Sequence, residues 1–417
     1  MNAVILSIGD ELVLGQTIDT NSAWLSSQLA AEGVMTVYHQ TVPDQIDDIS
    51  SAITTASKSA DLLIITGGLG PTKDDLTRNA LAKVLNQQLE LHEASLDRIS
   101  LFFKSLGREM PPSNKIQAML PKGTSPLNND WGTAPGIEAT ISNCRIFVFP
   151  GVPREMMQMF NRYVLPAIPT NIKRCILTET INTFGAGEST VAEKLGDLMQ
   201  RDRNPLIGTT VSGGIVSIRI RSDFPAIDTA RSQLEATVDI IRGRLDELVF
   251  GRGKDTLQEV VGTLARYRKK KLATAESCTG GLVARMLTDV TGSSDYFIGG
   301  WVVYSNDLKT RELGIPVELI TEYGAVSEQV ASAMALQALL KAGSDLSVSL
   351  TGIAGPGGGT PAKPAGTVWI GIATKNDGKA SATAQRFIFP GDRSIVRDRA
   401  AKTALNMMRL SLTRGYT

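Results

Sequence analysis

Short apolar runs alternate with segments of helical periodicity in the first part of the chain. Ala3–Ile8, Val34–Thr41 and Asp61–Thr66 have the length and apolar character of buried strands. Asn21–Glu32 and Ile46–Ser57, which lie between them, carry apolar residues at helical spacing. Strands that alternate with helices are typical of a parallel sheet covered by helices on both faces. The pattern therefore predicts an α/β domain.

The pattern changes in the middle of the chain. Thr209–Val211 and Ile215–Arg221 are short runs of strand character that flank Gly213 and Gly214, which is a hairpin signal. A helix is expected next, because its apolar residues form one stripe: Ile227, Leu234, Val238, Ile241 and Leu245. These features predict a small α+β module, which we interpret as a spacer or a dimer contact.

Strands and helices alternate again after Gly251–Lys254, which is expected to be a linker. Leu272–Glu276 and Gly299–Tyr304 are predicted strands, and a helix is expected from about Leu282. The fold class is therefore α/β, with two three-layer α/β domains joined by a small α+β module. The expected boundaries are 1–168, 169–250 and 251–417.

Composition limits the kinds of partner. A chain of 417 residues is too long for one ordinary core, and 42% hydrophobic with 20% charged residues is typical of a globular protein. The formal charge of +1 provides no basic field for nucleic acid. No apolar run approaches the roughly 20 residues that cross a bilayer. We therefore expect small-molecule ligands, with no nucleic-acid or membrane partner.

Cysteine and histidine are scarce. Cys144, Cys175 and Cys278 are too widely spaced for a disulfide framework or a zinc knuckle, so a reducing cytoplasm is expected. The two histidines, His39 and His92, both lie in the N-terminal quarter. A Ser-His-Asp triad within the C-terminal half is therefore excluded.

A glycine-rich turn with paired carboxylates follows the third predicted strand. Glycines let backbone N–H groups approach a phosphate closely, whereas Asp74 and Asp75 would repel a bare phosphate. A divalent cation that bridges these carboxylates to a pyrophosphate explains both features. Asp10 and Asp44 follow the first two strands, at the edge where α/β sheets bind ligands. The predicted ligand-binding residues are Gly67, Gly68, Gly70 and Thr77, and the predicted metal ligands are Asp10, Asp44, Asp74 and Asp75.

This region resembles the molybdopterin-binding (MoCF-like) fold, whose signature is a Gly-Gly-x-Gly turn followed by Asp and Thr. In that family the acids at the positions of Asp75 and Asp44 are functional. Three segments, Gly70–Thr77, Gly132–Gly136 and Phe149–Glu155, are similar to the N-terminal half of the competence/damage-inducible CinA family. The resemblance implies hydrolysis of the pyrophosphate of ADP-ribose with Mg, Mn or Co, and molybdopterin binding is an older label.

A second set of turns lies in the C-terminal half. Ser277 stands where a strand passes into a helix, so its hydroxyl can be exposed and the N–H groups beyond it can stabilise an oxyanion. Tyr304 and Lys309 lie at the next strand–helix junction, and a third turn, Thr351–Gly359, follows another apolar strand. Three turns that follow three strands suggest one shared cleft.

If Ser277 is a nucleophile, another side chain must take its proton. Without histidine, the remaining base is a lysine with a lowered pKa, or a lysine assisted by tyrosine, which makes Lys309 and Tyr304 the candidates. Cys278 is a rival nucleophile. Glu276 is either an orienting carboxylate or a strand-end carboxylate in contact with solvent.

Ala275–Gly281, Tyr304–Lys309 and Thr351–Thr360 closely resemble the C-terminal domain of the CinA family, also called PncC. The resemblance implies deamidation of nicotinamide mononucleotide to nicotinic acid mononucleotide and ammonia without a metal, around Ser277, Tyr304 and Lys309. It also implies a homodimer. The residues expected to hold the substrate are Thr279, Gly280, Gly281, Gly355, Gly357, Gly358 and Arg393, with Arg397 as a further source of charge.

Two other functions stay open at this point. The first is a protein that binds molybdopterin or a nucleotide without turnover. The second is an interaction protein in competence or the DNA-damage response, which the neutral charge supports little.

Overall fold

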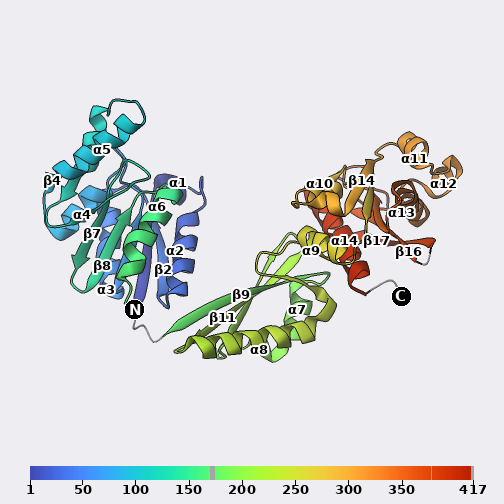
Figure 1. Cartoon of the computed structure of the whole chain (residues 1–417), viewed down its shortest axis with the longest axis horizontal. Coiled ribbons are helices and arrows are strands. Elements are labelled where there is room, and N and C mark those ends of the chain that lie inside the picture. The colour runs from blue at the N-terminus through green and yellow to red at the C-terminus, as the bar shows by residue number, and fades with distance from the viewer. Residues whose placement is uncertain (170–173, 377, 415–417) are drawn as a thin grey trace. The chain divides into compact units, whose positions relative to one another are not determined.

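The computed structural model describes residues 1–169, 174–376 and 378–414 (Figure 1). The chain divides into two compact units. The first unit comprises Met1–Leu177 with Ser222–Gln233, and the second comprises Thr178–Arg221 with Leu234–Thr417. No helix among the described residues is long and apolar enough to span a membrane.

The first unit is built on a six-stranded sheet with the order β2-β1-β3-β8-β7-β6. Its strands are β1 (Asn2–Ile8), β2 (Met35–Val42), β3 (Leu62–Thr66), β6 (Ser125–Leu127), β7 (Gly136–Ile141) and β8 (Cys144–Phe149). Its helices are α1 (Asp10–Val13), α2 (Thr20–Ala31), α3 (Ile46–Ser59), α4 (Thr77–Leu85), α5 (Glu93–Ser105) and α6 (Pro153–Met159). A separate two-stranded sheet pairs β4 (Leu89–Leu91) with β5 (Met119–Pro121).

Alternate residues of the central strands pack on opposite faces of this sheet. Val4 and Leu6 of β1 belong to a core with Ile53 of α3, whereas Ile5 belongs to another core with Leu25 of α2. Because side chains of a strand alternate between faces, each face needs its own helical cover. The predicted three-layer arrangement is confirmed.

One edge of the sheet differs from the all-parallel arrangement that the sequence predicts. β1, β2, β3 and β8 pair in parallel, but β7 runs antiparallel to β8, and β6 runs antiparallel to β7. Only Ser142 and Asn143 separate β7 from β8. Two residues suffice for a hairpin, whereas a parallel connection needs a crossover of about a dozen residues.

The middle module has a four-stranded sheet with the order β10-β11-β9-β12. Its elements are β9 (Cys175–Phe184), β10 (Leu206–Ser212), β11 (Ile215–Phe224), β12 (Val249–Arg252), α7 (Glu188–Leu195) and α8 (Ile227–Leu245). β10 and β11 form the predicted antiparallel hairpin. The predicted linker Gly251–Lys254 is wrong in part, because β12 pairs with β9 and extends to Arg252.

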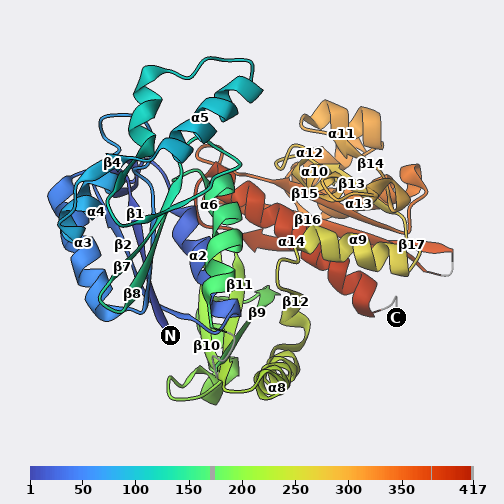
Figure 2. The ribbon, with the colours of Figure 1, turned by 60° about the vertical axis from the view of Figure 1, so that its left-hand side comes forward.

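The C-terminal part has a five-stranded sheet with the order β14-β13-β15-β16-β17 (Figure 2). Its strands are β13 (Leu272–Glu276), β14 (Phe297–Val302), β15 (Leu346–Gly352), β16 (Thr367–Asn376) and β17 (Lys379–Ile388). Its helices are α9 (Leu257–Tyr267), α10 (Leu282–Thr288), α11 (Asn306–Leu313), α12 (Val317–Tyr323), α13 (Glu328–Ala342) and α14 (Arg393–Arg414). β13 is parallel to both of its neighbours, β14 and β15. β16 is antiparallel to β15 and to β17. The carboxyl ends of β13 and β15 therefore meet at one edge of the sheet.

Arg409 of α14 joins the last helix to the middle module within the second unit. Its side chain is 5% exposed, and its guanidinium donates to the carbonyls of Glu247 and Val249 and to Asn406 Oδ1. Burial lowers the pKa of Arg409, while the charge of Glu247 opposes the shift. A buried guanidinium that saturates two carbonyls is a strong structural tie.

We expect Arg409→Leu to destabilise the second unit by about 3 kcal/mol, because two partly buried carbonyls lose their donor and the buried guanidinium is removed. Guanidinium chloride unfolding of a Trp24→Phe, Trp131→Phe background would follow Trp301 and Trp369, which lie in this unit. Arg242→Leu, at an exposed position of α8, is the matched control. An unchanged midpoint in the Arg409 variant would contradict this role.

Candidate functional site

Ser277 lies at the carboxyl end of β13, on the turn that leads into α10. Its N–H donates to Leu350 O of the neighbouring strand at 2.9 Å. The turn then reverses through Gly280 and Gly281, whose φ angles are 62° and 90°. These left-handed conformations favour glycine. The turn holds Ser277 at the edge of the sheet, 8% exposed.

Glu276, the residue before Ser277, is completely buried. Its carboxylate accepts hydrogen bonds from the N–H groups of Val283 (3.1 Å) and Ala284 (2.8 Å), in the first turn of α10. A carboxylate at a helix N-terminus satisfies free donors and complements the helix dipole. Glu276 therefore fixes the turn that carries Ser277. It neither contacts solvent nor orients Lys309.

Lys309 of α11 is buried directly beside Ser277. Its side chain is 1% exposed, and Nζ lies 3.1 Å from Ser277 Oγ. Nζ also donates to the carbonyls of Val303 (3.0 Å) and Tyr304 (3.3 Å). Burial lowers the pKa of Lys309. No carboxylate among the described residues forms an ion pair with it, so nothing offsets this effect by charge pairing.

The three contacts of Lys309 suit a neutral amine. Its two hydrogens can point to the carbonyls of Val303 and Tyr304, which leaves the lone pair directed at the hydroxyl of Ser277. After a proton transfer the same carbonyls would stabilise the ammonium. This geometry can activate an alcohol without histidine.

The turn after Ser277 also offers backbone donors. No hydrogen bond joins the N–H groups of Thr279 and Gly281 to another described residue. The side chain of Thr279 is completely buried, its hydroxyl has no partner among the described residues, and its carbonyl accepts from Arg397 Nη2 at 2.7 Å. Thr279 as a whole has no exposed surface, whereas Gly280 and Gly281 of the same turn reach the surface, so the two glycines are the residues of this turn that can contact a ligand.

Tyr304 and Arg393 link the other two turns of the cluster. Arg393, the first residue of α14, donates to Tyr304 Oη at 2.8 Å and to Gly355 O at 3.1 Å. The ring of Tyr304 is exposed, and its hydroxyl faces Arg393 and not Lys309, so assistance of the lysine by this hydroxyl is absent from the geometry. Gly357 and Gly358 lie on the exposed part of the same loop.

The glycine turn of the first unit lines a cavity of about 440 Å³. Asp75 closes this turn, because its carboxylate accepts from the N–H groups of Gly70 and Thr72 at 2.7 and 2.8 Å. Thr77 is completely buried and donates to Gly67 O at 2.9 Å. It supports the turn and does not line the cavity. The φ angle of Gly68 is 66°, and a Cβ there would collide with the Thr77 hydroxyl.

Asp10 and Asp44 face each other across two strand ends. The N–H of Asp10 donates to Asp44 Oδ2 at 2.9 Å, and the N–H of Asp44 donates to Asp10 Oδ1 at 3.1 Å. Asp44 and Asp74 line the cavity, whereas Asp10 does not. Burial raises the pKa of Asp44, and the charges of Asp10, Glu11 and Asp74 add to the shift.

The carboxylates do not form a complete metal cage. Among the described residues, no three or more His, Cys, Asp or Glu side chains gather closely enough to hold a metal ion. Mg²⁺ in nucleotide sites is often held by one or two carboxylates together with substrate phosphates and water. The mutual repulsion at Asp44 and the adjoining glycine turn fit that kind of site, with Asp44 and Asp74 as the protein's share.

Two further residues of this site, Arg78 and Glu155, were not predicted from the sequence. Arg78 is buried and donates to the carbonyls of Leu69 and Gly70, so its side chain holds the glycine turn in place from the interior of the domain. Glu155 lines the cavity, and burial raises its pKa although Asn129 donates to it. Glu155 is the last residue of Phe149–Glu155, a segment that resembles the CinA family. This resemblance is the sequence feature that could have indicated Glu155.

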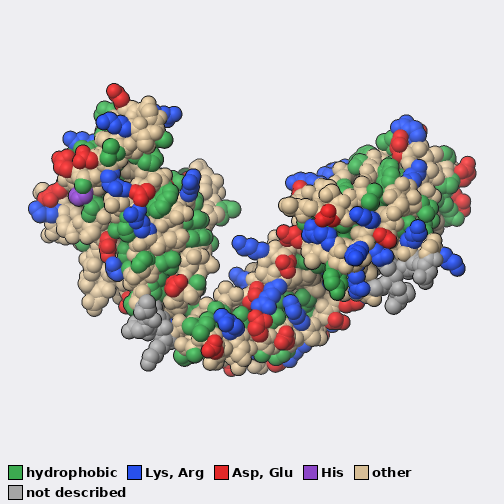
Figure 3. Space-filling model, viewed as in Figure 1, with side chains coloured by type: hydrophobic (Ala, Val, Ile, Leu, Met, Phe, Trp, Pro, Cys, Tyr) green, Lys and Arg blue, Asp and Glu red, His purple; other side chains and the backbone are tan. Residues whose placement is uncertain are grey.

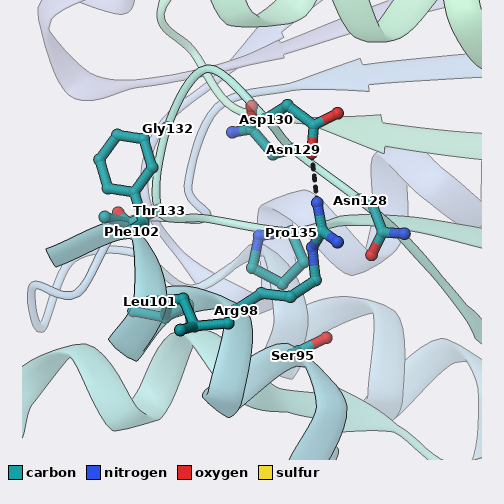
Figure 4. Close-up of a pocket in the computed structure, with 11 residues that line it drawn as sticks. Ser95, Arg98, Leu101, Phe102, Asn128, Asn129, Asp130, Gly132, Thr133 and Pro135 are labelled. Atoms are coloured by element: carbon teal, nitrogen blue, oxygen red, sulfur yellow. Dashed lines mark hydrogen bonds and ion pairs between the residues drawn. The ribbon is translucent and has the colours of Figure 1, made fainter. Parts of the chain in front are cut away.

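A second cavity of about 300 Å³ shares Thr133 with the first one (Figure 4). Phe102 and Arg98 of α5 line it, and an ion pair joins Arg98 to Asp130. These residues come from α5 and from the loop before β7. Because α5 and this loop are far apart along the chain, no local sequence pattern predicts the cavity.

Three family models match the chain. "Probable molybdopterin binding domain" matches residues 4–170, "Damage-inducible protein CinA KH domain" matches 178–251, and "CinA C-terminal domain" matches 254–412. A CinA-like protein of Dictyoglomus thermophilum is 40% identical over 99% of either chain, and one of Geobacter sulfurreducens is 39% identical over 99% of either chain. A crystal structure of the protein CinA from Thermoplasma acidophilum is 32% identical over 40% of this chain and 98% of that chain, with a TM-score of 0.38.

Cys278, the rival nucleophile, is expected to be unreactive. Burial raises the pKa of its thiol to about 12, which leaves a thiolate fraction of about 10⁻⁴ at pH 8. Burial also raises the pKa of Cys144 to about 11, whereas Cys175 is partly exposed. Titration of the native protein with a disulfide reagent should show one fast thiol, Cys175, and three thiols after unfolding. Rapid labelling of Cys278 would restore it as a candidate.

Proposed function

The chain belongs to the CinA family, and from this premise we propose that its C-terminal domain hydrolyses the amide of nicotinamide mononucleotide to nicotinic acid mononucleotide and ammonia. The observation that supports the proposal is the 3.1 Å contact between Lys309 Nζ and Ser277 Oγ. A buried lysine without a carboxylate partner is unusual in proteins, because burial disfavours its charged form. A catalytic base needs that property.

The reaction follows from the positions of these groups. Neutral Lys309 takes the proton of Ser277 Oγ, which attacks the amide carbon and forms a new C–O bond. The N–H group of Gly281, which has no partner among the described residues, stabilises the oxyanion. The ammonium of Lys309 then returns the proton to the amide nitrogen, the C–N bond breaks, and ammonia leaves. Water attacks the ester with Lys309 again as base, which releases the carboxylate and restores Ser277.

We expect the phosphate of the substrate to bind at the start of α14. Arg393 and Arg397 converge on the turns at Gly355 and Thr279, where they contact carbonyls and the Tyr304 hydroxyl. Guanidinium groups suit a phosphate, because their paired N–H donors match its oxygens. The exposed ring of Tyr304 offers a surface for the pyridine ring.

We expect Ser277→Ala and Lys309→Met each to reduce ammonia release from nicotinamide mononucleotide by about 10³-fold or more, because the nucleophile or its base is lost. Ammonia would be measured with the full-length protein. Lys341→Met, at an exposed position of α13, is the control and should keep full activity. Full activity in the Ser277 variant would remove the acyl-enzyme route.

The pH dependence of kcat/KM should report Lys309. Because burial lowers its pKa from the ordinary 10.5, the neutral base forms at a lower pH than a free lysine would require. The rate should therefore rise with pH and level off below pH 10.5. A rate that keeps rising through pH 10.5 would contradict a lysine base with a lowered pKa.

For the N-terminal domain we propose a metal-dependent hydrolysis of the pyrophosphate of ADP-ribose to AMP and ribose 5-phosphate. The supporting observation is the glycine-turn cavity with Asp44 and Asp74 on its wall. The carboxylates would bind Mg, Mn or Co together with the phosphates, and the metal would neutralise phosphate charge. Glu155, whose pKa is raised by burial, is a further polar group of this cavity.

AMP should form from ADP-ribose when one of these metals is added, and Asp44→Asn should lower the rate by about 10²-fold or more, since the cation loses a charged ligand. Ser277→Ala serves as the control and should leave AMP formation unchanged, because Ser277 belongs to the other unit. Binding of ADP-ribose without AMP would instead support a nucleotide-binding protein.

The partners in this proposal are small nucleotides, with a homodimer and a cytoplasmic location as the family resemblance and the cysteine pattern imply. Basic and acidic side chains are interspersed on the face that Figure 3 shows. The KH-matching segment 178–251 contains no Gly-x-x-Gly, the loop with which KH domains clamp nucleotides. Neither feature supports direct nucleic-acid binding.

A further inference from the structure

A cavity of about 530 Å³ lies within the second unit, bounded by α14, β17 and the strands of the middle module. Its lining shares no residue with the cluster around Ser277. The volume lies in the range of small-molecule sites, which hold mostly apolar side chains and a few placed polar groups. This cavity has both kinds of lining.

One wall is a single stripe of α14. Arg399, Thr403, Asn406 and Leu410 follow one another at helical spacing, so they share one face of the helix. The Thr403 hydroxyl donates to Arg399 O at 2.8 Å and is satisfied within the helix. Arg399 and Asn406 are the groups left to meet a ligand, roughly 10 Å apart along the axis.

Arg399 has an unused donor. Its Nε is buried and has no hydrogen-bond partner, and no carboxylate pairs with its guanidinium among the described residues. The nearest acid on its own helix, Asp398, already pairs with Lys402 at 2.8 Å. This Nε is closed to solvent, so an anion would meet the terminal N–H groups of Arg399, a partly exposed residue that lines the cavity.

Asn406 presents a second donor. Its Oδ1 accepts from Arg409 Nε at 2.9 Å, which fixes the orientation of the amide. The Nδ2 group therefore points the other way, where a Cβ added at Gly185 would lie 3.8 Å from it. Gly185 is itself part of the lining, so this amide hydrogen is available to an acceptor in the cavity.

Aromatic rings form the wall from β17. Phe387 and Phe389 stack with ring centroids 5.7 Å apart and an interplanar angle of 7°, and Arg399 lies over the Phe389 ring. Phe184 of β9 adds a third ring. Phe389 is 7% exposed, whereas Phe387 is partly exposed, so Phe387 is the ring on which a planar ligand ring can pack. The guanidinium at their end supplies a positive charge.

We propose that this cavity binds a small organic anion of mononucleotide size that carries a planar aromatic ring. Its carboxylate or phosphate pairs with Arg399, its ring packs on Phe387, and an acceptor on the ring meets Asn406 Nδ2. The site is separate from both proposed catalytic sites and does not depend on their activities.

Hydrogen–deuterium exchange of the full-length protein tests this site, because peptides locate the protected amides. The probes are AMP, for a phosphate, 1-naphthoate, for a carboxylate, and decanoate, a flexible aliphatic anion of similar charge. We expect AMP or 1-naphthoate to protect residues 211–214 and 385–389, and the probe that does so identifies the anionic group. Decanoate should not protect them.

Arg399→Gln should weaken this protection about tenfold or more, because a charge-assisted hydrogen bond is lost. Gly187→Leu should also remove it: Gly187 lines the cavity, its φ of −77° suits any residue, and a Cβ there has nothing within 4 Å. Arg242→Gln is the matched control. No protection by either aromatic probe, equal protection by decanoate, or unchanged affinity in both cavity variants would overturn the proposal.

Discussion

The burial of one lysine amine beside a serine hydroxyl is the constraint around which the C-terminal domain is arranged. Lys309 lies in the first turn of α11, and the carbonyls of Val303 and Tyr304 accept its hydrogens. Glu276 secures the turn on the other side, so Ser277 has little freedom to move away. Removing an amine from water costs several kcal/mol unless it loses its charge. Burial therefore lowers the pKa of Lys309, so its neutral form becomes accessible at a lower pH than that of a free lysine.

Much of this arrangement could be predicted from the sequence. The strand Leu272–Glu276 has the predicted bounds, and α10 begins at the predicted residue, because apolar runs and glycines mark these boundaries clearly. Because the C-terminal half contains no histidine, a lysine is the remaining type of base, and the sequence therefore predicts Lys309 in that role. The structure then places Lys309 Nζ within hydrogen-bonding distance of Ser277, although the catalytic roles of both remain predictions.

Other features depend on contacts between distant segments, which no local pattern records. The antiparallel edge of the first sheet follows from the two-residue connection between β7 and β8, which the pattern of apolar runs does not reveal. The Tyr304 hydroxyl accepts a hydrogen bond from Arg393, which lies 89 residues further along the chain. Arg78 supports the glycine turn from within the core, where an arginine is not expected. The aromatic cavity draws on β9, β17 and α14.

The strand β12 has a consequence for how this protein can be divided. A fragment that began at Gly251, the predicted boundary, would cut β12 and would lack β9, the strand with which β12 pairs. It would also remove Glu247 and Val249, whose carbonyls hold the side chain of Arg409. An expression fragment meant to isolate the C-terminal domain would thus begin with unpaired residues of β12, and the Arg409 guanidinium in its last helix would lack its two carbonyl acceptors. Truncation before Thr178, the start of the second compact unit, keeps both intact.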